Sequence, residues 1–135
     1  MPTSKITYLG ELRTEATHLN SGNMIITDAP TDNQGKGEAF SPTDLVATAL
    51  GSCMLTIMGI KAEAMQKNIK GTTVEITKVM YSEPRRIGEI IVHIEVPDAA
   101  LTDKEKQLLI NAAHTCPVAK SLDAAIKQEI EIVFK

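Results

Sequence analysis

The sequence predicts an α+β protein in which largely antiparallel sheets surround one long apolar helix. Three observations indicate this class. Strand-like segments fill the N-terminal third, a long uncharged helix candidate follows, and a hairpin, two shorter helices and a last strand complete the chain. Strands and helices do not alternate regularly, as they would in βαβ units, so a doubly wound parallel sheet is not predicted.

The N-terminal third is predicted to form three strands followed by a loop. Alternating strand-forming residues and turn signals place the strands at Lys5–Leu9, Leu12–Leu19 and Asn23–Asp28, with Asn20–Gly22 as a turn. Residues 29–38 (APTDNQGKGE) are rich in Gly, Pro, Asn and Asp, so this segment is predicted to be a loop.

The strongest helix signal is Ser41-Pro42-Thr43-Asp44. Ser41 can cap the helix, and Pro42 suits the first helical position. Asp44 completes a capping box and lies at the positive end of the helix dipole. The helix is predicted to run to about Asn68, with Gly71 ending it.

The first part of this helix, Leu45–Ile60, has no charged residue over 16 positions. A helix that is apolar nearly all round is buried on most sides. We therefore expect a second subunit to supply part of its cover. The stretch is shorter than the roughly 20 residues that span a bilayer, so a membrane helix is not predicted.

The second half of the chain is predicted to contain a hairpin, two helices and a strand. Thr73–Tyr81 and Ile87–Val96 flank a turn at Glu83–Arg86, and the second strand carries an apolar residue at every second position. A capping box at Thr102–Glu105 opens a helix that ends near His114. This helix has Leu108, Leu109, Ala112 and Ala113 on one face, and a short helix from Cys116 to Leu122 and a strand at Ile126–Phe134 follow it.

Composition excludes several function classes. The chain has 135 residues and a net charge of −3, which fits one domain over residues 1–135. Basic residues are scattered and Trp is absent, so no nucleic-acid partner is expected. No apolar run follows a basic N-terminus, so we expect a cytoplasmic protein without a secretory signal or a membrane partner.

Cys53 is the first candidate for chemistry. In a cytosolic chain the two cysteines are not expected to form a permanent structural disulfide. A lone cysteine in the middle of a core helix is most often a small hydrophobe. Gly51 and Ser52 leave room beside its sulfur, but the helix N-terminus is distant, so a nearby cation is needed to favour the thiolate.

Cys116 is the second candidate and directly precedes Pro117. Pro is favoured at the first helical position, so Cys116 is a candidate N-cap where free N–H groups and the helix dipole stabilise a thiolate. The alternative is a turn cysteine without function. From the residues alone, Cys116 is the better nucleophile of the two.

The remaining candidates are few. The chain has three arginines, and two of them, Arg85 and Arg86, lie in the predicted hairpin turn, while Arg13 lies in a predicted strand. The three histidines and two cysteines include no tightly spaced pair of ligands, so no metal site is expected.

Two motifs carry a resemblance to a known family. Phe40–Leu45 (FSPTDL) and Ala49–Cys53 (ALGSC) open the long helix, and Ala113–Val118 (AHTCPV) lies near the C-terminus. With these motifs the chain resembles, over nearly its whole length, the OsmC/Ohr family of osmotically induced and organic hydroperoxide resistance proteins. The likeness is closer to the OsmC-like branch.

The resemblance implies an intertwined homodimer with long helices back to back and two active sites at the subunit interface. It also implies a thiol peroxidase in which Cys53 attacks a small hydroperoxide, becomes a sulfenic acid and is trapped by Cys116 as a disulfide. No cofactor is bound, and an external dithiol, such as a lipoyl group, or a small thiol restores the cysteines. These roles reverse the ranking from the residues alone. The family's activating arginine corresponds to Arg13.

One position departs from the family pattern. Typical members place a Glu ten residues before the first cysteine, where it orients the arginine, and here that position is Thr43. Asp44 either replaces this Glu or serves only in the capping box. Two other functions stay open: a non-catalytic dimer that binds a small molecule or senses redox state with the same cysteine pair, and a purely structural dimer.

Overall fold

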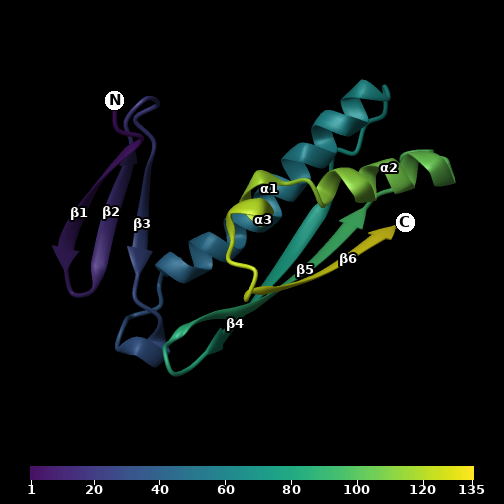
Figure 1. Ribbon diagram of the computed structural model, residues 1–135. Coiled ribbons are helices and arrows are strands. Elements are labelled where there is room, and N and C mark those ends of the chain that lie inside the picture. The colour runs from purple at the N-terminus through teal and green to yellow at the C-terminus, as the bar shows by residue number, and fades with distance from the viewer. The chain divides into compact units, whose positions relative to one another are not determined.

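The computed structural model describes all 135 residues, which form two compact units. Residues 1–46 form the first unit and residues 47–135 the second. The long helix α1 (Pro42–Ala64) begins in the first unit and continues into the second. Figure 1 shows the order of the elements along the chain.

The first unit contains a three-stranded antiparallel sheet, as predicted. Its strands are β1 (Ser4–Gly10), β2 (Arg13–His18) and β3 (Met24–Asp28), in the order β1-β2-β3. A single 3₁₀ turn (Thr31–Asn33) interrupts the predicted loop behind them. The sheet leaves large apolar side chains exposed, because its strands pair with one another without a helix of their own unit to cover a face.

The predicted capping box at the start of α1 is confirmed. The backbone N–H of Asp44 donates to Ser41 Oγ at 3.1 Å, and the backbone N–H of Ser41 donates to Asp44 Oδ2 at 2.9 Å. Two N–H groups of the first turn are thereby satisfied, which stabilises this helix start.

The predicted end of α1 is wrong by about one turn. The helix ends at Ala64, before Asn68, because Gln66 adopts a left-handed backbone with φ 58°. The backbone N–H of Lys67 donates to Ala62 O at 2.9 Å, and that of Gln66 donates to Glu63 O at 3.0 Å. This is the Schellman pattern, and Gln is not a residue that usually marks it, so Gly71 was the more obvious signal.

The second unit packs α1 against a three-stranded sheet. Its strands are β4 (Thr73–Tyr81), β5 (Arg86–Val96) and β6 (Lys127–Phe134), in the order β4-β5-β6. The predicted β4–β5 hairpin is confirmed, and β6 pairs parallel to β5. The parallel pair needs a crossover, which α2 (Asp103–Ala113) and α3 (Pro117–Ser121) provide.

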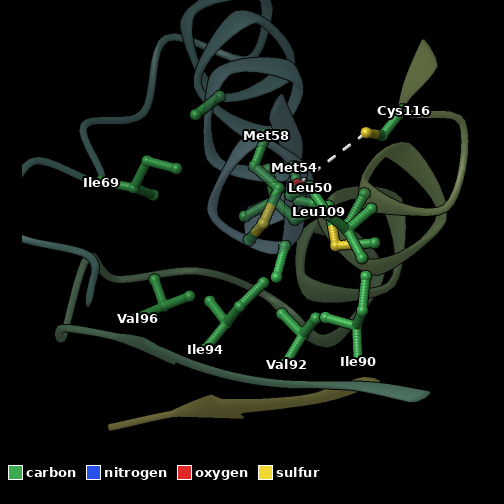
Figure 2. Close-up of a cluster of buried hydrophobic side chains, with 13 residues drawn as sticks. Leu50, Met54, Met58, Ile69, Ile90, Val92, Ile94, Val96, Leu109 and Cys116 are labelled. Atoms are coloured by element: carbon green, nitrogen blue, oxygen red, sulfur yellow. Dashed lines mark hydrogen bonds between the residues drawn. The ribbon is translucent and has the colours of Figure 1, made fainter. Parts of the chain in front are cut away.

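The core of the second unit lies between α1 and this sheet. Figure 2 shows the side chains of β5 pointing toward α1 and α2. As the period-2 pattern predicted, alternate residues of β5 are fully buried, and they meet buried residues of the helices: Ile90, Val92, Ile94, Val96, Leu50, Met54, Met58 and Leu109. The alternation therefore fixed which face of β5 is inside.

One face of α1 is buried within the chain and the other is not. Leu50, Met54 and Met58 are fully buried, whereas Ile60 is 61% exposed. By length and composition alone α1 could cross a membrane. Because its buried face forms the core of the second unit, it is the core helix of a soluble fold.

Gly51 lies where α1 approaches β4 closely. A Cβ at this position would lie 2.9 Å from Ile76 Cδ1 and 3.3 Å from Val74 Cγ1. We expect Gly51→Val to destabilise the protein by about 1–3 kcal/mol, because the added methyl groups overpack this contact. Urea unfolding measures the change, with Ala64→Val at an exposed helix end as the control. Equal effects of the two substitutions would contradict the packing argument.

Candidate active site

Cys53 lies in the middle of α1 and is half-buried. It packs at the margin of the core of the second unit. The residue two positions before it, Gly51, is buried, and its neighbour Ser52 is exposed. Cys53 is thus held by the core on one side and accessible on the other in the single chain.

Cys116 is the N-cap of α3, as predicted from the proline that follows it. Its sulfur accepts a hydrogen bond from the backbone N–H of Ala119 at 3.4 Å. The side chain is 0% exposed. The cap therefore fixes the position of a buried thiol at the start of a short helix.

The fold brings the two cysteines together from distant parts of the sequence. Cys116 Sγ lies 4.0 Å from the carbonyl oxygen of Leu50, one turn before Cys53 on α1 (Figure 2). The sulfur of Cys53 is close enough to the Cys116 thiol to affect its ionisation. Both cysteines are free thiols in the structure. The contact between α3 and α1 thus places two reduced sulfurs side by side.

The prediction that the N-cap position favours a Cys116 thiolate is wrong in its net effect. Burial, and next the neighbouring Cys53 sulfur, raise the pKa of Cys116 above its ordinary value of 9.0. The N–H groups of Ala119 and Val118 act in the opposite direction, as the helix-cap argument expected, but they are outweighed. In the folded protein the Cys116 thiol therefore keeps its proton to a higher pH than an ordinary cysteine does.

The raised pKa also has a consequence for stability. The folded protein favours the neutral form of Cys116 more than the unfolded chain does. Its contribution to stability is therefore fully present below about pH 9 and is lost as the pH rises through the folded pKa.

Arg13 is the first residue of β2 and forms an ion pair within the first unit. Its Nε–H donates to Asp28 Oδ1 at 2.6 Å, and its Nη2 donates to Oδ2 at 3.1 Å. Glu38 Oε1 lies 3.5 Å from the same Nη2. The side chain of Arg13 is 33% exposed and that of Asp28 is 1% exposed. The guanidinium is therefore held along one edge by a buried carboxylate.

The pair shifts both ionisation equilibria toward the charged forms. The hydrogen bonds from Arg13 lower the pKa of Asp28, and the carboxylate of Asp28 raises the pKa of Arg13. Because the folded-state pKa of Asp28 is depressed, its contribution to stability is present above its ordinary value of 3.8 and is lost as the pH falls through the folded pKa. The pair is charged at neutral pH.

Asp44, the other predicted site carboxylate, lies in the capping box of α1. Its Oδ2 accepts the backbone N–H of Ser41, as described above. This hydrogen bond is the one that the capping-box interpretation of Asp44 requires.

Asp28 and Glu38, the two carboxylates beside Arg13, were not among the predicted site residues. The signal that could have found Asp28 is the register of the β2–β3 hairpin. A three-residue turn centred on Ser21 would pair Arg13 with Ala29, whereas the four-residue connection actually formed pairs it with Asp28. Opposite charges directly across two antiparallel strands attract each other, so the correct register would have predicted the pair.

Two of the other candidate cations are held by groups within the second unit. Arg86 donates to the carbonyl oxygens of Ser82 at 3.0 Å and Pro84 at 2.8 Å, within the hairpin turn where it was predicted. His93 lies on the outer face of the second sheet, 2.7 Å from Glu131 Oε1. Arg13 belongs to the first unit and both cysteines belong to the second.

Comparisons with known proteins agree with this fold. A solved structure of an osmotic stress induced and detoxification response protein, so described, from Psychrobacter arcticus is 59% identical, with a TM-score of 0.93 over 98% of this chain and 96% of that one. An organic hydroperoxide resistance protein OsmC from Legionella pneumophila is 15% identical, with a TM-score of 0.75 over 98% of each chain. An OsmC-like protein from Mycoplasma pneumoniae is 17% identical, with a TM-score of 0.80 over 97% of this chain and 94% of that one.

For the two relatives that are 15% and 17% identical, the structural similarity shows a shared fold alone. Comparison with curated proteins finds no match. The model of the OsmC-like protein family matches residues 35–131, a range that includes α1 with Cys53 and the short helix capped by Cys116. Together with the two-sheet α+β fold and the relative that is 59% identical, this match shows that the chain belongs to the OsmC-like protein family.

Proposed function

We propose that this protein is a thiol peroxidase that reduces organic hydroperoxides with Cys53 and Cys116. Its family and its structural neighbours link it to the response to hydroperoxide stress. The observation that carries the mechanism is the contact between Cys116 and the turn of α1 that precedes Cys53, with both thiols reduced.

In the first step the Cys53 thiolate attacks one oxygen of the peroxide. The S–O bond forms, the O–O bond breaks, and the leaving alkoxide takes a proton to become an alcohol. Cys53 is thereby oxidised to a sulfenic acid. In the second step the sulfur of Cys116 attacks the sulfur of Cys53 and expels water, which forms the disulfide. An external dithiol of the lipoyl type, or two small thiols, then reduces the disulfide by exchange.

The assignment of Cys53 as the attacking residue is supported by exposure and ionisation. Cys53 is half-buried, so a substrate can reach it, whereas Cys116 is 0% exposed. The raised pKa of Cys116 disfavours its thiolate, which is the form that attacks a peroxide. A resolving thiol needs to be close rather than exposed, and Cys116 meets this condition.

Arg13 is the proposed activating cation. Cys53 lies far from the N-terminus of α1, so the helix dipole does not reach its sulfur. A guanidinium in the assembled protein would favour the thiolate and stabilise the negative charge that develops on the leaving oxygen. Arg13 is the one arginine that lies outside the β4–β5 turn region.

A homodimer is the proposed assembly. The exposed face of α1 in the second unit carries Ala49, Ser52, Thr56 and Ile60 at helical spacing, without a charge. In the first unit Ile6, Tyr8 and Ile25 are 64%, 64% and 50% exposed. Apolar faces of this kind on a sheet and a helix are normally covered by another element, and a second copy of the chain can cover both symmetrically.

The proposed location is the cytoplasm, where thiols stay reduced.

The experiment that tests the function is titration of thiols with stoichiometric hydroperoxide. A peroxidase loses two thiols per equivalent of an organic hydroperoxide and turns over when a dithiol reductant is supplied. Tert-alkyl and fatty-acid hydroperoxides are compared with hydrogen peroxide, and lipoyl reductants with small thiols. Thiols that stay unreactive toward all three oxidants would rule out the peroxidase and leave a binding or structural dimer.

The dimer makes a separate prediction. Sedimentation at micromolar concentration is expected to give about twice the chain mass of 14.6 kDa. Ile60→Asp is expected to shift the equilibrium toward monomer or to reduce solubility, because it places a charge on the exposed apolar face of α1. Lys104→Asp on the exposed side of α2 is the control and should leave the dimer intact. A stably folded wild-type monomer would contradict the assembly.

A further inference from the structure

The ion pair between Arg13 and Asp28 restricts the arginine more than charge attraction alone would. The Nε and Nη2 groups of Arg13 bind the two carboxylate oxygens of Asp28 separately, at 2.6 and 3.1 Å. Two parallel hydrogen bonds of this kind fix the plane of the guanidinium as well as its distance. Asp28 therefore decides in which direction the rest of the guanidinium points.

Asp28 is itself held in place. Its Oδ2 also accepts the backbone N–H of Glu38 at 3.0 Å, and its own backbone N–H donates to Phe40 O at 3.1 Å. The side chain is 1% exposed, so its charge has little contact with water and depends on these donors. The carboxylate is held at the last residue of β3, directly opposite Arg13, the first residue of the neighbouring strand β2.

The two hydrogen bonds to Asp28 leave one edge of the Arg13 guanidinium available. The Nη1 group of Arg13 makes no hydrogen bond or ion pair with a protein group in the structure, and the side chain is one-third exposed. Two N–H donors therefore remain for an anionic partner. In the proposed reaction, such a partner is the thiolate or the developing alkoxide.

We propose that Asp28 is the positioning residue of the activating arginine, and that it fixes the guanidinium so that its Nη1 edge stays available to an anionic partner. This inference rests on the proposed function. In typical family members, a Glu at the position of Thr43 orients the arginine. In this protein the proposal gives that role to a carboxylate on β3. Asp44 then acts in the capping box of α1.

The test is a double-substitution cycle of Arg13→Met and Asp28→Asn, made with Cys116→Ser so that Cys53 is the only thiol. The readouts are the rate of Cys53 oxidation by a tert-alkyl hydroperoxide and the pH profile of its alkylation. Asp28→Asn is expected to slow oxidation about tenfold or more and to shift the profile toward higher pH. In the Arg13→Met background it should have no further effect, because Asp28 acts through the arginine.

Glu11→Gln is the matched control, since Glu11 is a nearby surface carboxylate that pairs with Lys36 at 3.0 Å and makes no hydrogen bond to Arg13. Glu11 acts on Arg13 through charge alone, so the effect of Glu11→Gln on both readouts should be much smaller than that of Asp28→Asn. Asp28→Glu keeps the charge and displaces it by one methylene group, so it should fold and oxidise at an intermediate rate even where Asp28→Asn is unstable.

The outcomes separate this inference from the proposed function. Slow oxidation in Arg13→Met with normal oxidation in both Asp28 variants would overturn the role of Asp28 alone. A further loss from Asp28→Asn in the Arg13→Met background would also overturn it, since Asp28 would then act independently of the arginine. Normal oxidation in Arg13→Met would remove the arginine from the reaction and this inference with it.

Discussion

Cys53→Ser is expected to abolish peroxide turnover and the trapping of sulfenic acid, while the protein stays folded. Serine does not attack the O–O bond under these conditions, and Cys53 lies at the margin of the core, where the smaller hydroxyl is tolerated. Chemical trapping of sulfenic acid, followed by mass spectrometry of the intact chain, measures the result directly. The chain has only two cysteines, so each variant leaves one thiol to follow.

Cys116→Ser is the partner experiment and has the opposite expected result. Cys53 should still be oxidised, but its sulfenic acid should persist because no internal thiol resolves it. Serine is also a favoured N-cap residue, so α3 should keep its cap on the N–H of Ala119. If Cys116→Ser is the variant that no longer reacts with peroxide, Cys116 is the attacking residue and the roles proposed here are reversed.

Arg13→Met is expected to slow the oxidation of Cys53 by an order of magnitude or more, with the dimer intact. Removing the cation withdraws stabilisation from both the thiolate and the leaving oxygen. The alkylation profile of Cys53 should move toward higher pH, because a negative sulfur is less favoured without the guanidinium. Circular dichroism and sedimentation should show whether the fold and the assembly are retained.

Arg13→Met also unpairs Asp28, whose buried carboxylate then loses its main partner. The pKa of Asp28 is lowered chiefly by Arg13. We therefore expect the free energy of unfolding of Arg13→Met to be below that of the wild type near neutral pH, and this difference to shrink as the pH falls. Arg13→Lys keeps a charge but lacks the bidentate edge, so it separates loss of charge from loss of geometry. An unchanged alkylation profile in Arg13→Met would direct the search to Arg85, Arg86 or His114.

Local patterns in the sequence predicted most elements of this fold. The capping boxes at Ser41 and Thr102 predicted both helix starts, and each is present with both of its hydrogen bonds. The alternation in β5 predicted its buried face. These features depend on neighbours within a few residues, and such interactions are written directly in the sequence. The helix end at Gln66 was missed because the left-handed residue there is not a glycine.

The candidate site was predicted only in part. Residue type and motif context were enough to choose Cys53, Cys116 and Arg13. They were not enough to predict how the fold changes the ionisation of Cys116. Cys116 has the favourable cap that the sequence indicates, and its pKa is nevertheless raised. Burial is a property of the packed fold, and here it outweighs the local hydrogen bonds.

By itself, the sequence determined the helix starts, the alternation of the strands, the family and the N-cap position of Cys116. Only the tertiary structure decided that the Cys116 thiol meets α1 at Leu50, and that Asp28 holds Arg13. The physical reason is that both contacts join segments far apart in the chain. One depends on how α3 docks on the helix, and the other on the register of a hairpin, where a shift of one residue would replace the carboxylate with a methyl group.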